Sequence, residues 1–227
     1  MKKDVAILFD LDNTLYDAEQ YFNGAFKEIS KYLDDKYGIN KNESHKNLLK
    51  LWKEKTSMYP YLFNDFLKMV STENKKNIES ELENIIKIFN GHYGKLKLYS
   101  DVTPVLKKFR NVGYKMGIIT DGTVERQKRK IKLLNVEEFF DVVIYTKELE
   151  SPKPSTVPFL KALKELHTKP QNSFYVADNP LIDFEGAKKI DMKTVRIMRG
   201  EFKNKLSNEF VDYNIITLED LITIVRT

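Results

Sequence analysis

Two aspartates lie close together at the end of a short apolar segment near the start of the chain. Asp10 and Asp12 follow the run from Val5 to Phe9, which is typical of a strand buried on both faces in a parallel sheet. Neighbouring carboxylates repel each other unless a cation or a shared proton relieves the repulsion. An isolated pair usually marks a solvated turn, because Asp favours turns. The pair therefore indicates a catalytic or metal site only if other reactive residues join it.

A hydroxyl and a glycine end the second segment of this type. Thr120 ends the segment 115–120, and Asp121 and Gly122 precede a predicted helix. The free N–H groups at the start of a helix, together with a permissive glycine, form a site for an anion such as phosphate. Taken alone, these residues are equally consistent with a helix N-cap.

A lysine and two further aspartates follow the next segments. Lys153 lies between Pro152 and Pro154, which restrict the backbone around it, and Asp178 ends an apolar segment five positions before Asp183. The carboxyl ends of parallel strands meet at one edge of a sheet, where α/β proteins bind their ligands. We therefore expect all of these side chains to gather at that edge.

The elements that must position these residues alternate between strands and helices. Such alternation predicts a doubly wound, mostly parallel α/β sheet with right-handed crossovers. The predicted strands cover residues 5–9, 115–120, 141–145, 173–178, 194–197 and 213–216. The predicted helices cover residues 102–111, 124–134, 157–166 and 183–190, with a last helix from residue 218.

Residues 17–95 interrupt the alternation. Apolar residues recur there every three or four positions, as in Phe22, Phe26, Ile29 and Leu33, and this spacing predicts four amphipathic helices. We therefore predict an α/β domain made of residues 1–16 and 96–227, with a helical domain of residues 17–95 inserted after the first strand.

The ordered set of motifs resembles the haloacid dehalogenase (HAD) superfamily, over a range from about residue 5 to residue 197. The four motifs of that family match Asp10-Leu11-Asp12-Asn13-Thr14, then Thr120, Lys153 and the pair Asp178 and Asp183. The place of the helical insertion is similar to that of the helical cap in the C1 subclass of the family.

Three positions depart from the usual pattern of the family. Ala177 stands where Gly commonly precedes the aspartate, Asp121 stands where Asn or Ser is frequent, and Pro152 directly precedes the lysine. None of these departures removes a side chain that the chemistry requires.

The resemblance implies a phosphatase that works through an aspartyl-phosphate. Asp10 would attack phosphorus, and Asp12 would protonate the leaving alcohol and then deprotonate the water that hydrolyses the intermediate. Thr120 and Lys153 would act on the transferring phosphoryl group, the first by a hydrogen bond and the second by its charge. The N–H groups of residues 121 and 122 would hold further phosphoryl oxygens.

The resemblance also implies Mg²⁺ as the cofactor, because a carboxylate that attacks a phosphate dianion needs its charge screened. The implied ligands are Asp10, the main-chain carbonyl of Asp12, and Asp178. Asp183 would bind the ion directly or through water.

The same residues help to distinguish a phosphatase from other activities found on related folds. Asp12 favours phosphoryl transfer over dehalogenation, because attack on a carbon–halogen bond releases no alkoxide that needs a proton. A response-regulator receiver has its phosphorylated aspartate at the end of the third strand, where this chain has Tyr145 and Thr146, so the order excludes it. A phosphomutase of the β-phosphoglucomutase type uses the same motifs and remains an alternative to a hydrolase.

The composition predicts a folded protein without disulfides. The 227 residues are 41% hydrophobic, include no cysteine and carry a formal net charge of +5. No apolar run approaches the ~20 residues needed to span a bilayer, and the run at residues 5–9 is too short for a signal peptide. We therefore expect a cytoplasmic protein without a membrane partner, and nothing in the sequence indicates its oligomeric state.

Much of the positive charge lies in two predicted helices. Residues 107–132 contain nine Lys or Arg and two Asp or Glu, and the densest part is 126–132. Nucleic-acid binding by this basic helix is the alternative from a different class of function. No nucleic-acid motif accompanies it, and most such runs form a solvated helix face. We expect a small phosphorylated substrate rather than a nucleic acid.

Overall fold

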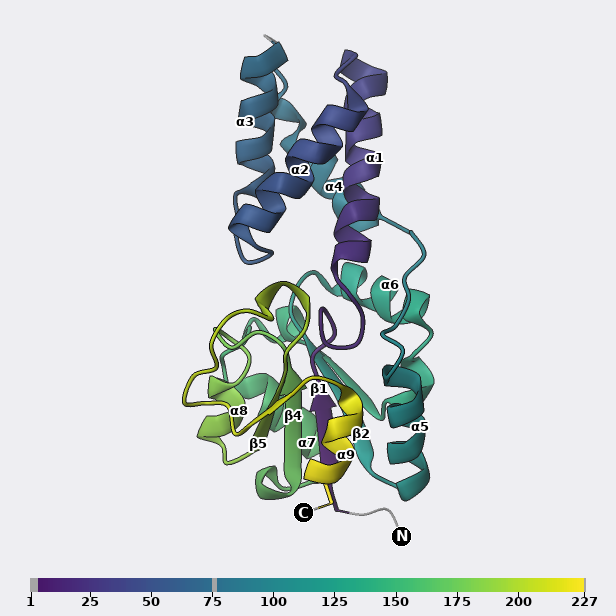
Figure 1. Cartoon of the computed structure of the whole chain (residues 1–227), viewed down its shortest axis with the longest axis vertical. Coiled ribbons are helices and arrows are strands. Elements are labelled where there is room, and N and C mark those ends of the chain that lie inside the picture. Colours follow the sequence, from purple (N-terminus) through teal and green to yellow (C-terminus); the bar gives the residue numbers. More distant parts are fainter. Residues whose placement is uncertain (1–3, 75–76, 227) are drawn as a thin grey trace. The chain divides into compact units, whose positions relative to one another are not determined.

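The computed structural model describes residues 4–74 and 77–226, which divide into two compact units (Figure 1). The first unit contains the chain up to Ala18 and again from Leu96, and the second runs from Glu19 to Lys95. The second unit thus begins two residues later than the predicted boundary. The main-chain N–H of Ala18 donates to the side-chain oxygen of Asn13, which holds this end of the segment to the first unit. The predicted ranges also include residues 1–3, 75–76 and 227, which lie outside the described residues.

The first unit contains a parallel sheet, so the predicted α/β fold is confirmed. Among the described residues, the strands follow the order β3-β2-β1-β4-β5-β6, and every neighbouring pair is parallel. The strands are β1 (Ala6–Phe9), β2 (Lys115–Thr120), β3 (Val142–Tyr145), β4 (Ser173–Ala177), β5 (Lys193–Ile197) and β6 (Tyr213–Ile215). Their ends differ from the prediction by one residue at most.

The order of the strands reverses at β1. From this strand the chain builds outward to β2 and β3 on one side, and later to β4, β5 and β6 on the other. Ligands of open α/β sheets bind at the carboxyl ends of strands at such a switch point. The N–H of Asp10 continues the pairing beyond β1 by donating to the carbonyl of Val176 at 2.9 Å. The ends of β1, β2 and β4 therefore lie side by side.

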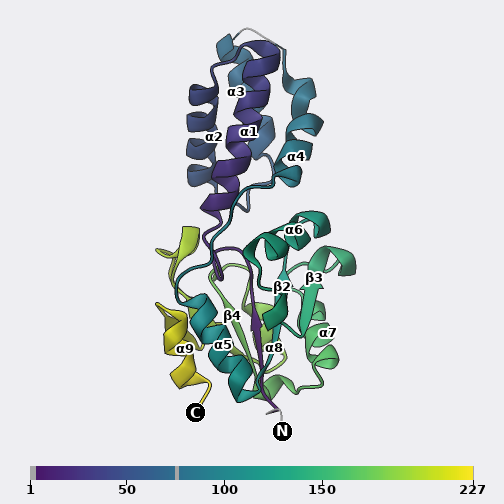
Figure 2. The same cartoon turned by 90° about the vertical axis from the view of Figure 1, so that its right-hand side faces the viewer.

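Helices cover both faces of this sheet. They are α5 (Val102–Val112), α6 (Val124–Leu134), α7 (Val157–Glu165), α8 (Glu185–Lys189) and α9 (Leu218–Ile224). Helices α5 and α9 pack against each other, while α7 and α8 pack together elsewhere on the sheet (Figure 2). The core beneath α7 and α8 joins Phe159 and Phe184 to Leu8 and Tyr175 of the strands.

The chain leaves and re-enters the first unit at neighbouring points. Tyr16 forms an antiparallel bridge with Leu98, and the N–H of Tyr99 donates to the carbonyl of Leu15 at 3.1 Å. Arg199, beyond β5, donates to both carboxylate oxygens of Asp101 at 2.9 Å. These contacts hold the two connecting segments together within the first unit.

The second unit consists of helices, as predicted. They are α1 (Glu19–Tyr37), α2 (Lys41–Lys55), α3 (Leu62–Asn74) and α4 (Leu82–Gly91). Phe26, Leu48, Phe66 and Phe89 are buried in its core. Ile86 belongs to the apolar face expected for α4, yet its side chain is exposed, because the buried face of this short helix is centred on Ile85 and Phe89. No helix in the described ranges is long and apolar enough to cross a membrane.

A buried carboxylate in this helical unit is surrounded by donors. Glu81 accepts hydrogen bonds from the hydroxyls of Tyr32 and Tyr37, from Lys36 at 2.9 Å and from Asn84 at 2.7 Å. The two tyrosine hydrogen bonds are the main cause that lowers the pKa of Glu81 to about 2. Glu81 therefore stays ionised and links α1 to the start of α4.

Candidate active site

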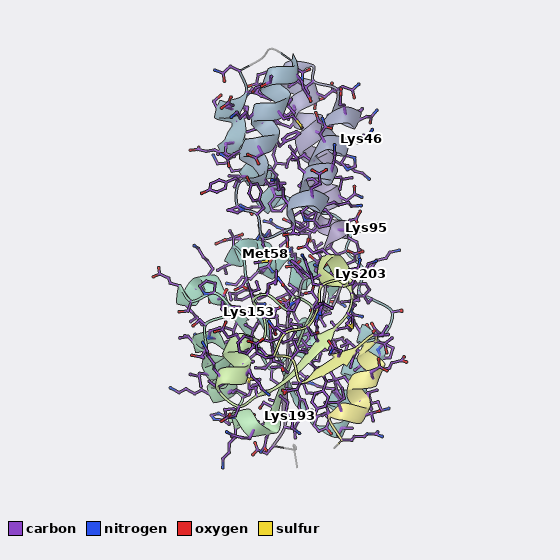
Figure 3. The ribbon with its side chains drawn as sticks, turned by 60° about the vertical axis from the view of Figure 1, so that its left-hand side comes forward. Lys46, Met58, Lys95, Lys153, Lys193 and Lys203 are labelled. Carbon is purple, nitrogen blue, oxygen red and sulfur yellow. The ribbon has the colours of Figure 1, made fainter. Side chains whose placement is uncertain are left out.

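Lys153 binds two buried aspartates at the carboxyl ends of the strands. Its ammonium donates to Oδ1 of Asp10 and to Oδ1 of Asp183, both at 2.7 Å, and to the hydroxyl of Tyr175 at 3.1 Å. Lys153 lies within the α/β unit (Figure 3), and all three of its partners are buried. Although burial acts in the opposite direction, Asp10 and Asp183 raise the pKa of Lys153 well above its ordinary value, so it is an ammonium.

The loop after β3 places Lys153 through contacts with Asp121. The Asp121 carboxylate accepts from the main-chain N–H of Lys153 at 3.4 Å and from the hydroxyl of Thr146. Its other oxygen lies 3.7 Å from the Lys153 ammonium. Gly122 has a φ of +109°, in the left-handed region that favours glycine, and an added Cβ would lie 2.5 Å from the Arg126 guanidinium. The predicted anion turn therefore has the backbone form that requires its glycine.

Asp178 and Asp183 follow β4 and differ in their contacts. Both oxygens of Asp183 accept hydrogen bonds, one from Lys153 and the other from the N–H of Asn179 at 2.9 Å. Asp178 is equally buried, but its Oδ2 has no hydrogen-bond partner. Its main-chain carbonyl accepts from the fully buried Arg196 at 3.2 Å, which fixes the backbone at the end of β4.

The negative charge of the carboxylates near Lys153 exceeds the positive charge of its single ammonium. Burial, followed by the charges of Asp183 and Asp10, raises the pKa of Asp178 well above its ordinary value. Burial raises the pKa of Asp10 to about 7, although Lys153 opposes the shift. Such a cluster is stable only with an added cation or a retained proton, so it has the electrostatic character of a reactive site.

Asp12 lies two residues beyond Asp10 and has a different set of partners. Lys130 donates to both of its oxygens, at 2.6 and 2.9 Å, and Gln127 donates to Oδ2 at 2.9 Å. The hydroxyl of Tyr16 donates to Oδ1. Although burial alone would raise it, Lys130 lowers the pKa of Asp12 to about 2. Asp12 is therefore a carboxylate, whereas Asp10 sits among like charges.

Comparisons with known proteins identify the family. A family model described as haloacid dehalogenase-like hydrolase matches residues 7–197. The chain belongs to this family. It is 34% identical to the glyceraldehyde 3-phosphate phosphatase of Methanocaldococcus jannaschii, over 97% of this chain and 96% of that protein. The predicted membership of the HAD superfamily and the prediction of a phosphatase enzyme are therefore confirmed.

Solved structures of HAD proteins share the fold. The crystal structure of a HAD phosphatase from Thermococcus onnurineus is 28% identical, has a TM-score of 0.69 and covers 97% of each chain. The structure of the putative HAD hydrolase YfnB from Bacillus subtilis, which is bound to magnesium, has a TM-score of 0.71 at 16% identity, over 98% of this chain and 99% of that chain. At that identity YfnB shows the fold alone.

The arrangement of this HAD hydrolase bears on the predicted metal ligands. In residues 4–74 and 77–226, no group of three or more His, Cys, Asp or Glu side chains is arranged to hold a metal ion. The side chains of Asp12 and Asp183 already accept hydrogen bonds on both oxygens. Asp178 has an unpartnered buried oxygen and is affected by the charge of Asp10, and carboxylate oxygens suit Mg²⁺. The side-chain chemistry of Asp10 and Asp178 is thus compatible with a divalent cation.

The predicted phosphate-binding residues of the hydrolase lie on β2 and the loops after β2 and β3. Thr120 is buried at the end of β2, where its hydroxyl oxygen accepts from Gln127 at 2.5 Å. The Asp121 side chain contacts the Lys153 loop, whereas the role predicted from the sequence concerns its main-chain N–H. Thr120 and Lys153 thus lie at the ends of adjacent parallel strands and their loops.

Sequence reasoning did not single out the contacts of Lys130, Gln127 and Tyr175. Lys130 was grouped with the basic run 126–132, yet it is buried, whereas Lys128 and Lys132 are exposed. The helical period contained the missing signal, because residues 127, 130, 131 and 134 share one face of α6 and all four are buried. Tyr175 gave no such signal, because an aromatic residue within an apolar strand segment is typical of the core.

Proposed function

We propose that this chain hydrolyses a small phosphomonoester through an aspartyl-phosphate on Asp10, with Mg²⁺ as cofactor. The observation that carries the proposal is the Lys153 ammonium bound to both Asp10 and Asp183 at the ends of β1 and β4. The contact with Lys153 leaves Oδ2 of Asp10 outside that hydrogen bond, as a nucleophile requires. Buried like charges next to it are the usual environment of a group with a chemical role.

The residues of this chain divide the reaction between them. Asp10 attacks phosphorus and becomes the aspartyl-phosphate, while the ammonium of Lys153 balances the charge that collects on the transferring oxygens. The Thr120 hydroxyl and the main-chain N–H groups of Asp121 and Gly122 hold those oxygens. Asp12 exchanges the proton with the leaving alcohol and with the attacking water.

The metal would be held by Asp10, Asp178 and the main-chain carbonyl of Asp12. When bound, Mg²⁺ supplies the positive charge that lets a carboxylate approach a phosphate dianion. Asp183 has a different role, because its two oxygens hold Lys153 and the N–H of Asn179. It would contact the ion only through water.

Relatives indicate the class of substrate. The relative from Methanocaldococcus jannaschii is named as a glyceraldehyde 3-phosphate phosphatase and is similar along its whole length, which supports a phosphorylated three-carbon compound as the substrate. The helical unit, in the position of a C1 cap, is the proposed determinant of this choice. Phosphomutase activity with a sugar phosphate is the alternative that the same residues allow.

A substrate panel tests the proposal. Purified protein with Mg²⁺ is assayed for phosphate release from glyceraldehyde 3-phosphate, phosphoglycolate, nucleoside monophosphates and hexose phosphates. We expect release to be fastest with the triose phosphate and to require Mg²⁺. An isomerised sugar phosphate without phosphate release would indicate a mutase, and no product from any compound would overturn the proposal.

A further inference from the structure

Asp12 is held from one side by helix α6. Gln127 and Lys130 lie three residues apart on this helix, so their side chains leave the same face. Lys130 reaches both carboxylate oxygens of Asp12, and Gln127 reaches Oδ2. Two side chains from one rigid element therefore fix both the position and the rotation of the carboxylate.

The burial of these two residues is unusual for their types. Gln127 is 0% exposed and Lys130 is 3% exposed, although both residue types normally lie at the surface. A buried ammonium is costly unless it is paired, and the contacts at 2.6 and 2.9 Å to Asp12 supply that pairing. The inward placement of Lys130 therefore depends on Asp12, a residue of the proposed chemistry rather than of the core.

Gln127 also connects Asp12 to the phosphate-binding strand end. The same Nε2 group donates to the hydroxyl oxygen of Thr120 at 2.5 Å and to Asp12 at 2.9 Å. The amide oxygen of Gln127 is buried without a hydrogen-bond partner. The two contacts of Nε2 thus tie the Asp12 carboxylate to the Thr120 hydroxyl through one buried amide group.

Each of these contacts to Asp12 comes from a donor. Lys130, Gln127 and the hydroxyl of Tyr16 all place hydrogens on its two oxygens. Both oxygens of Asp12 are therefore held in place, which is what a group that must meet a substrate atom or a water in one geometry requires.

We propose that Lys130 and Gln127 are positioning residues, which hold the Asp12 carboxylate where it accepts the proton of the water that hydrolyses the phosphoenzyme. This inference rests on the proposed function. In the step concerned, the water oxygen bonds to phosphorus as the bond between phosphorus and the Asp10 oxygen breaks. The proton of the water passes to Asp12, Asp10 recovers its carboxylate, and inorganic phosphate is released.

The test separates formation of the phosphoenzyme from its hydrolysis. With 4-nitrophenyl phosphate, the leaving group departs without help from an acid, so only the second step needs Asp12 strongly. We expect Lys130→Met to lower kcat by about tenfold to a hundredfold, within the range that general base catalysis contributes. KM should fall in parallel, because the phosphoenzyme accumulates. The ratio kcat/KM should stay within about twofold of the wild type, and rapid mixing should show a burst of one nitrophenolate per protein.

Matched variants complete the experiment. Lys132→Met makes the same change at an exposed position on α6 and should leave both constants unchanged. Lys130→Arg keeps a donor to both oxygens and should restore part of kcat, and Gln127→Leu should show a smaller fall of the same kind. Thermal unfolding of each variant, followed by circular dichroism, confirms that it is folded.

The outcomes are distinct. An equal fall of kcat and kcat/KM without a burst, or an unchanged kcat in Lys130→Met, would overturn the positioning role while the wild type stays active. A rise in kcat would overturn it as well, because Lys130 would then be holding Asp12 away from its task. A wild-type protein that releases no nitrophenolate would overturn the proposed function itself, and the inference with it.

Discussion

Two buried carboxylate sites, one in each unit, have opposite hydrogen-bond arrangements. In the helical unit, Glu81 is surrounded by four donors, which lower its pKa to about 2. In the α/β unit, Asp178 keeps a buried oxygen without any partner, and burial raises its pKa well above the ordinary value. The first arrangement stabilises the fold, because every acceptor is satisfied. The second stores repulsion at the place where a substrate and a cation are expected.

This contrast separates structural from functional burial of charge. Both groups are hidden from water, so burial alone does not distinguish them. The distinguishing feature is whether donors within the protein outweigh the burial and the like charges around the carboxylate. Where they do, removal of the charge should weaken the protein, and where they do not, removal should leave the protein stable but inactive.

The largest effect is expected at the proposed nucleophile. Asp10→Asn should lower phosphatase activity by on the order of a thousandfold or more, because no other side chain can form the covalent intermediate. The melting temperature should stay the same or rise, since the change removes one of several like charges. Phosphate release and circular dichroism measure the two properties. Asp35→Asn, at an exposed position of α1, should change neither, and a folded Asp10→Asn protein of normal activity would contradict the assignment.

The second largest effect is expected on the stabilisation of the protein by Mg²⁺. Mg²⁺ should raise the melting temperature of the wild type above its value in EDTA, because a ligand that binds only the folded state stabilises it. Asp178→Asn should show little or no Mg²⁺-dependent increase. In EDTA this variant should be at least as stable as the wild type, because Asp178 lacks a hydrogen-bond partner for Oδ2. Equal Mg²⁺-dependent increases in both proteins would exclude Asp178 as a ligand.

A moderate loss of stability is expected at Glu81. Glu81→Gln removes the charge that four donors share, and should lower the free energy of unfolding by about 2 kcal/mol. Urea titration followed by circular dichroism measures the change. Glu83→Gln, at an exposed position two residues further on, is the matched control and should have little effect. If both variants lost the same stability, the network around Glu81 would not be the cause.

The smallest expected effect is the pH dependence of the difference in unfolding free energy between the wild type and Glu81→Gln. The folded pKa of Glu81, about 2, lies below its ordinary value of 4.5. Its contribution is therefore fully present above the unfolded pKa and is lost as the pH falls through the folded pKa. The difference in unfolding free energy between wild type and Glu81→Gln should be constant from pH 7 to about pH 5 and shrink below that. A free-energy difference that grew on acidification would contradict the prediction that ionised Glu81 is the stabilising form.

The sequence predicted the strand ends well, because apolar runs followed by Asp, Thr or Lys are visible in the letters alone. It placed the start of the helix after β4 at Asp183, whereas α8 begins at Glu185. The reason is that the Asp183 side chain caps the turn at Asn179 and binds Lys153 instead of opening the helix. A contact with a residue thirty positions away in the sequence thus decides the role of Asp183.

Contacts between distant segments set the limit of sequence reasoning at this site. Arg196 was expected only as part of a buried strand. In the structure it is fully buried and donates to the main-chain carbonyls of Asp178, Phe202 and Lys205. Carbonyl oxygens are present at every position of a chain, so no pattern of residue types reveals which of them a guanidinium will bind.

The bridge between Tyr16 and Leu98 makes the two ends of the helical insertion meet as closely as the two strands of a hairpin. The bridge therefore closes the insertion at its base, next to the sheet. A change of length within the inserted helices should therefore leave the register of β1 against β2 unchanged. Variation within the insertion would in this way be uncoupled from the sheet that positions the proposed catalytic residues.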